Sequence, residues 1–174
     1  MGIQFETDYN METLTAMAKG LRKTVRRKRS RRVHIFAAVV LVLGILTILA
    51  TVAGGEPLGA SGVVTLLAML MVILVSLFED RLNAWFAKKR LLPGTEHAVA
   101  TFEEDGYVSA TSMSESKFSY AQIVAVAETE RYFVFALSSH HTQAYDKRNI
   151  RGGSVEDFRA FIAEKTGRPV EDIK

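Results

Sequence analysis

The hydrophobic pattern of the chain is dominated by two uninterrupted apolar runs. Residues 33–53 and 58–78 contain no Asp, Glu, Lys or Arg, and only Gly54-Gly55-Glu56-Pro57 separates them. A helix needs roughly 20 apolar residues to cross a bilayer, and within lipid it forms all its backbone hydrogen bonds internally. The pattern predicts a transmembrane hairpin of two helices, with Pro57 beginning the second. The alternative is a soluble protein with two buried core helices.

Basic residues flank the two runs on one side of the predicted hairpin. Residues 19–32 carry nine Lys or Arg and no acid, and the connecting loop carries no basic residue. The positive-inside rule then places both termini in the cytoplasm. Such residues can also contact anionic lipid; the candidates are Arg26, Arg27, Lys28, Arg29, Arg31, Arg32, Lys88, Lys89 and Arg90. The alternative is that they only determine topology.

Outside the hairpin, apolar and polar residues alternate with period two, which is typical of half-buried strands. Residues 3–9 show this pattern before the hairpin, and it recurs afterwards in residues 97–104, 107–113, 117–120, 123–129, 132–137 and 143–145. Asp105-Gly106 is a strong two-residue hairpin signal, and a second turn is expected at Glu130-Arg131. Because a lone strand must pair, we expect residues 3–9 to join the later sheet. The alternative is a loose N-terminal tail.

Helical spacing appears in three further segments. An amphipathic helix capped by Asn10 or Asp8 is predicted; its apolar face is Leu14, Met17, Ala18, Leu21 and Val25. Gly20 and Ser30 are the only breakers before the first apolar run, so the helix can continue into that run. Residues 79–92 extend the second run until Pro93-Gly94. Ser154 opens the last helix with a capping-box spacing to Asp157. That helix presents Phe158, Phe161 and Ile162 to the sheet and stops at Gly167 and Pro169.

These elements give the fold class and the domain organisation. We expect a two-helix transmembrane hairpin plus an α+β cytoplasmic domain with an antiparallel sheet and a C-terminal helix. The segments are a strand and basic helix in 1–32, spans in 33–53 and 58–78, a juxtamembrane helix in 79–93 and the cytoplasmic domain in 94–174.

Composition and charge narrow the function classes. Segment 94–174 carries thirteen acidic and nine basic residues, which argues against nucleic acid as a partner. The chain contains no cysteine, so it can form neither a disulfide nor a thiolate metal site. It also lacks a nucleophile elbow, a P-loop and a dinucleotide fingerprint. No carboxylate lies within the apolar runs, where an ion carrier would need one. We therefore expect neither an enzyme nor a transporter, and no cofactor.

Few residues of the predicted domain are candidates for a site. His140-His141 is the only paired imidazole, and solvated turn histidines are favoured over a metal site because no third ligand is suitably spaced. The cluster of Lys147, Arg148 and Arg151 is a possible anion or partner patch beside Gly152-Gly153, although a solvated loop is favoured.

Several stretches together resemble the YcxB-like family of small bacterial membrane proteins. They follow the two apolar runs and are Phe118-Ser119-Tyr120-Ala121-Gln122-Ile123, Glu128-Thr129-Glu130, Tyr132-Phe133-Val134-Phe135, Lys147-Arg148-Asn149-Ile150 and Glu156-Asp157-Phe158-Arg159. The resemblance implies a C-terminal domain similar to pleckstrin-homology-like sheets capped by a helix. Asp146 stands where many members have Pro, so no role is carried over to that turn. The family has no established activity to transfer.

In the pleckstrin-homology-like class, inositol phosphates usually bind basic residues of the first hairpin loop. The corresponding loop here is Glu103-Glu104-Asp105-Gly106, whose three carboxylates would repel a phosphate. We therefore exclude that binding mode.

Three hypotheses about function remain. The favoured one is a membrane-anchored, non-catalytic binding or scaffold protein of the bacterial inner membrane, whose cytoplasmic domain meets a protein partner or a second copy of itself. The second is a protein that senses anionic lipid through the basic segments beside the membrane. The third is a pore of oligomerised hairpins, which the apolar character of both runs disfavours.

Overall fold

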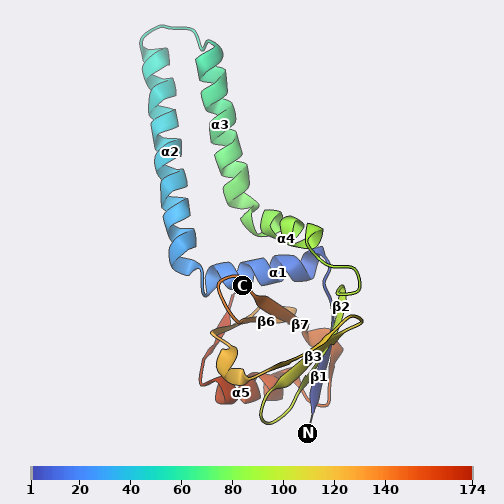
Figure 1. Ribbon diagram of the computed structural model, residues 1–174. Helices are drawn as coiled ribbons and strands as arrows, with labels where there is room; N and C mark the ends of the chain where they lie inside the picture. The colour runs from blue at the N-terminus through green and yellow to red at the C-terminus, as the bar shows by residue number, and fades with distance from the viewer. Residues whose placement is uncertain (1, 174) are drawn as a thin grey trace.

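The two apolar runs form antiparallel helices that project from the rest of the molecule in the computed structural model, which describes residues 2–173 (Figure 1). They are α2 (Arg27–Ala53) and α3 (Ala60–Leu77). Both are long and apolar enough to cross a membrane, and the most apolar window is 0% buried in α2 and 6% buried in α3. Apolar side chains left so uncovered are unlike those of buried core helices, which disfavours the soluble alternative.

Two shorter helices lie across the base of this hairpin. They are α1 (Met11–Lys23) and α4 (Glu79–Lys89). The expected continuous helix from residue 11 into the first apolar run is wrong, because α1 ends at Lys23 and a turn precedes α2. The reason is that α1 packs flat on the sheet, with Ala16 and Met17 against buried residues of the four-stranded sheet and Gly20 against Val134, whereas α2 projects away from it (Figure 1). The chain also bends at Phe78, between α3 and α4.

The start of α3 also differs from the prediction. Pro57 does not begin this helix; Gly59 takes the extended N-cap conformation instead, and the first helical residue is Ala60. The amide of Gly59 donates to the carbonyl of Pro57, so Pro57 belongs to the connecting loop.

The strand before the hairpin is part of the sheet that follows it, as predicted. β1 (Ile3–Asp8) pairs antiparallel with β2 (His97–Phe102), with Phe5 opposite Ala100. The five-stranded sheet has the order β4-β3-β2-β1-β8, in which the other members are β3 (Tyr107–Thr111), β4 (Glu115–Phe118) and β8 (Ile150–Arg151). The membrane-type hairpin is therefore an insertion within one folded domain.

The turn between β2 and β3 lies one residue earlier than predicted. Phe102 pairs with Tyr107, and the amide of Glu103 donates to the carbonyl of Gly106, so the loop residues are 104 and 105. Gly106 is required for another reason: a Cβ there would lie 2.5 Å from the carbonyl oxygen of Phe118. The glycine allows the backbone at the end of β4 to approach, rather than forming the turn.

The second sheet is four-stranded, in the order β7-β6-β5-β9. Its strands are β5 (Ala125–Glu128), β6 (Tyr132–Ala136), β7 (Thr142–Asp146) and β9 (Val170–Asp172). β9 runs parallel to β5, so the sheet is not wholly antiparallel. The chain also contains α5 (Val155–Thr166) and two 3-10 turns, η1 (Tyr120–Gln122) and η2 (Lys147–Asn149). The predicted capping box is present, since Ser154 Oγ accepts from the Asp157 amide at 3.0 Å.

An aromatic core joins the two sheets and α5. Phe5 of β1 is fully buried and lies against Phe102, Phe133, Tyr145 and Phe158, with ring centroids 4.6–6.3 Å apart. These residues come from both sides of the hairpin insertion, so the core cannot be completed by residues 94–173 alone.

Candidate ligand pocket at the base of the hairpin

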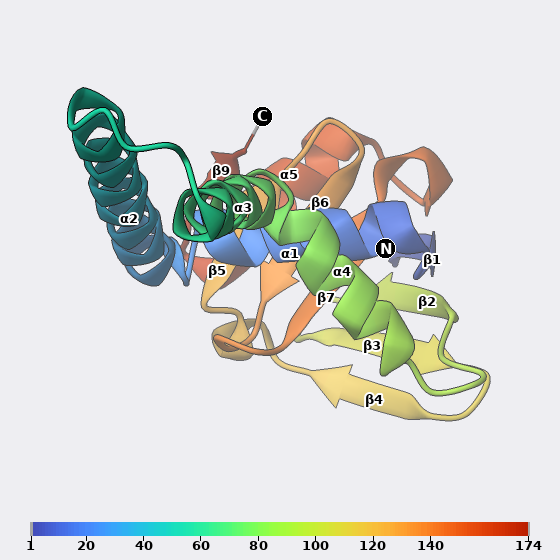
Figure 2. The same cartoon turned by 90° about the horizontal axis from the view of Figure 1, so that it is seen from above.

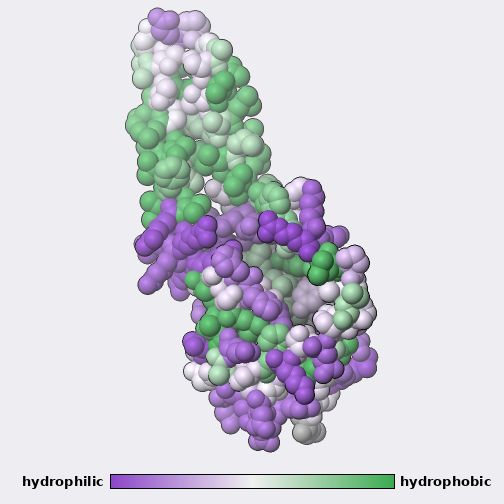
Figure 3. Space-filling view, in the orientation of Figure 1, coloured by the Kyte–Doolittle hydropathy of each residue, from purple (hydrophilic) through white to green (hydrophobic). Residues whose placement is uncertain are grey.

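Basic residues surround the base of the hairpin, where the apolar helices meet the folded domain. We call them the cationic belt: Arg26, Arg27, Lys28, Arg29, Arg31 and Arg32 at the start of α2, and Lys88, Lys89 and Arg90 at the end of α4. Figure 3 shows hydrophilic residues gathered at this level, directly below the hydrophobic surface of the hairpin. The structure therefore brings the two predicted groups of lipid-contacting residues to the same level of the molecule.

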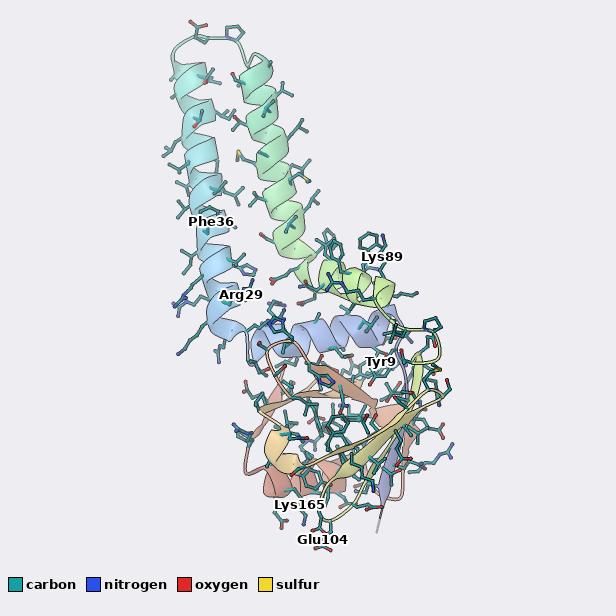
Figure 4. All side chains as sticks on the ribbon, viewed as in Figure 1. Tyr9, Arg29, Phe36, Lys89, Glu104 and Lys165 are labelled. Carbon is teal, nitrogen blue, oxygen red and sulfur yellow. The ribbon has the colours of Figure 1, made fainter. Side chains whose placement is uncertain are left out.

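Most of the belt is free of intramolecular ion pairs. Among residues 2–173, Arg29 and Arg90 have neither a hydrogen-bond nor an ion-pair partner through their side chains, and both are exposed (Figure 4 labels Arg29). Lys89 lies 3.6 Å above the ring of Trp85. Arg26 donates through Nε to the carbonyl of Ser139 at 2.6 Å, and its Nη2 lies 2.9 Å from Nδ1 of His140. Arg26 thus anchors the start of α2 to the loop between β6 and β7.

A bidentate ion pair fixes α1 to α4. Arg22 donates through Nε and Nη2 to the two carboxylate oxygens of Asp80, at 2.7 and 2.6 Å. These hydrogen bonds raise the pKa of the Arg22 guanidinium above its ordinary value. Glu79 lies 3.9 Å from Arg22 and also 3.9 Å from Nε2 of His34 on α2. The side chains of Arg22, His34 and Glu79 therefore bring α1, α2 and α4 together at one place.

A pocket of about 450 Å³ opens between α1, α4 and the start of α2. Its volume lies within the range of about 300–1,000 Å³ typical of small-molecule sites. Its lining includes the apolar residues Leu14, Leu21 and Phe86, and four arginines, Arg22, Arg26, Arg29 and Arg90. The pocket therefore combines apolar surface with cationic groups.

The second predicted basic cluster is arranged differently. Lys147 donates to Glu128 at 2.9 Å, and Arg151 lies 3.1 Å from Glu6. Arg148 lies 3.2 Å from Asp146, whose side chain also accepts from the Arg148 amide at the start of η2. Each of the three cations thus has a carboxylate partner, so the predicted patch is not a group of free positive charges. Asp146 therefore caps this turn.

The remaining candidates lie apart from one another. His140 contacts Arg26, whereas the His141 ring packs edge-on against Phe118. Within residues 2–173 no group of three or more His, Asp or Glu side chains is arranged to hold a metal ion. The loop from Glu103 to Gly106 lies at the opposite end of the domain from the hairpin, where Figure 4 labels Glu104.

Sequence reasoning missed Arg22, Asp80 and the pocket itself. Arg22 belongs to the basic run, but its partner lies 58 residues away, across both apolar helices. The available signal was that Glu79 and Asp80 are the first acids after the second run, which brings them back to the level of the basic residues.

Comparison with known proteins supports the resemblance found in the sequence. Residues 102–162 match the family model for YcxB-like protein, from the end of β2 to α5. The match confirms the YcxB-like resemblance in that segment and leaves the hairpin, α1 and α4 outside it. Neither a search of the curated proteins nor one of the solved structures finds a match.

Proposed function

We propose that this chain is a membrane-anchored, non-catalytic protein that binds anionic lipid through the cationic belt. In this proposal α2 and α3 span a bacterial inner membrane, and the domain and both termini lie on its cytoplasmic side. The single observation that carries the proposal is the position of the belt, which lies at the hairpin base directly below the hydrophobic surface and is largely without internal partners. Basic residues so placed each contribute roughly 1 kcal/mol of attraction to an anionic surface.

The fold supports a binding role rather than an active site. The two sheets and the capping helix α5 resemble the layout of pleckstrin-homology-like domains, and we assign the domain to that class on layout alone. The acidic loop between β2 and β3 faces away from the hairpin, which agrees with the exclusion of the usual inositol-phosphate mode. The belt, not that loop, is the surface with the charge and location to meet lipid head groups.

The test is the composition of the lipid retained by the full-length protein. The protein is extracted from membranes into polymer-bounded discs, and the lipids in each disc are compared with the bulk membrane. We expect anionic lipid to be enriched when the extraction is done near 0.1 M salt and the enrichment to fall near 1 M salt, because the screening length shrinks from about 10 Å to about 3 Å. A disc composition equal to that of the bulk membrane at low salt contradicts the proposal.

A protein partner or a second copy of the chain is the other candidate, and one observation favours it. β4 is the outer strand of the five-stranded sheet, and Figure 2 shows its free edge on the outside of the domain. An open edge can accept another strand through main-chain hydrogen bonds. Replacing Lys117 of β4 with proline would remove a backbone donor; we then expect oligomers crosslinked in native membranes to disappear. A monodisperse monomer in the wild type rules out self-association.

A further inference from the structure

The arginines of the pocket are unequally paired. Asp80 and Glu79 both lie near Arg22, with carboxylate oxygens 2.6 and 3.9 Å from its guanidinium nitrogens. Among residues 2–173, the other three lining arginines have no carboxylate partner. They are Arg26, Arg29 and Arg90, which come from three places in the chain: the turn before α2, the first turn of α2 and the end of α4. The backbone amides at the start of α2 add partial positive charge on the same side.

The apolar part of the pocket lining also restricts which ligand can fill it. Phe86 and Val33 line it, and both are about half exposed, at 51% and 53%. Val33 is the first residue of the apolar run, so this wall continues into the surface of the hairpin. An occupant that neutralises the arginines and also covers these side chains must be amphiphilic.

We infer that the pocket binds one phosphate-bearing amphiphile, with the phosphate between Arg26, Arg29 and Arg90 and an apolar chain along Val33 and Phe86. Guanidinium groups match phosphate oxygens with paired hydrogen bonds, which favours phosphate over a single-point anion. The inference rests on the proposed lipid-binding function and adds a saturable site for a single molecule to it. Glu79, in the lining of the same pocket, lies 3.9 Å from both Arg22 and His34 and is not paired with Arg26, Arg29 or Arg90.

The test uses the full-length protein in micelles of an uncharged, phosphate-free detergent. Trp85 is the only tryptophan, and its ring lies 5.0 Å from that of Phe86, so its fluorescence reports occupancy of the pocket. Titration with a short-chain phosphatidic acid should give a saturable change, and native mass spectrometry should count one retained lipid. Arg29→Gln combined with Arg90→Gln should raise the Kd at least about tenfold, because both guanidiniums lack internal partners and the fold does not depend on them.

The matched control is Arg31→Gln combined with Lys88→Gln, which removes the same charge from the belt outside the pocket lining. We expect it to change the Kd less than about twofold. Equal losses in the two double variants overturn the pocket site but leave diffuse lipid binding by the belt intact. Absence of any lipid binding by the wild type overturns both. Titration with glycerol 3-phosphate distinguishes a membrane lipid from a soluble phosphate as the ligand. Weaker binding than that of the lipid supports an amphiphilic membrane ligand. Equal binding overturns the need for an apolar chain and supports a soluble phosphate at the same site.

Discussion

Replacing Phe5 with alanine tests the idea that the residues before the hairpin complete the core of the domain behind it. Phe5 is 0% exposed, and its ring makes four aromatic contacts, the nearest to Phe158 at 4.6 Å. A buried Phe→Ala change costs about 3–5 kcal/mol, from lost transfer energy and the cavity that remains. Because aromatic pairs add about 0.5–1.5 kcal/mol each, the upper part of that range applies here, at about 4–5 kcal/mol.

This loss is large compared with the total stability of a small domain. Domains unfold with about 5–15 kcal/mol, so Phe5→Ala should remove about a quarter or more of that value. The assay is urea unfolding of the full-length protein in micelles, followed by near-ultraviolet circular dichroism of the tyrosines. All five tyrosines lie outside α2 and α3, so the signal reports the domain and not the hairpin.

Met113→Ala is the control, because Met113 is 71% exposed and its truncation should change the free energy of unfolding by less than about 0.5 kcal/mol. A loss below about 1 kcal/mol for Phe5→Ala would show that the first strand is peripheral, and the inserted-hairpin account would then fail.

Three further substitutions test other contacts. Hydrogen bonds from Arg159 are the main reason that the pKa of Glu128 is lowered, so the ionised side chain stabilises the fold above its unfolded pKa and loses this contribution as pH falls through the lower folded pKa. Glu128→Gln should therefore lower the free energy of unfolding by about 1–3 kcal/mol at pH 7, measured by urea unfolding. A penalty that persists unchanged in strong acid would contradict this. Asp80→Asn should weaken the tie to Arg22 and speed limited proteolysis at the turn between α1 and α2, with an unchanged cleavage rate as the contrary result. Gly106→Ala should lower the free energy of unfolding by about 1–3 kcal/mol, and with it the melting temperature, because the new Cβ would meet the carbonyl oxygen of Phe118. An unchanged melting temperature would show that the backbone at the end of β4 can move away at little cost.

Periodicity was sufficient to predict most elements of this fold. The apolar runs identified α2 and α3, and the alternation in residues 3–9 predicted that a strand before the hairpin would pair with the later sheet. The capping box at Ser154 gave the start of α5. These signals are local, and each element depends on a pattern repeated several times within its own segment.

The errors arose where a contact distant in sequence decides the local structure. Gly20 and Ser30 are the only potential helix breakers in residues 11–32, and neither lies at the turn. The chain turns before Arg27 because α1 is held on the sheet and Arg26 reaches Ser139. β8 and β9 have two and three residues, too few to show a period. The pocket escaped prediction because its walls come from four separate segments, although three of its arginines had been named as lipid contacts for their charge alone.

The most direct test of the membrane account is the sidedness of the hairpin tip relative to the domain. The chain has no native cysteine, so Gly55→Cys at the tip and Ser116→Cys on β4 each place one reporter in the full-length protein. In intact cells, a membrane-impermeant maleimide should label the tip cysteine, while the β4 cysteine should react only after the membrane is opened. Labelling of both cysteines, or of neither, in intact cells would contradict a hairpin that spans the membrane with the domain on its cytoplasmic side.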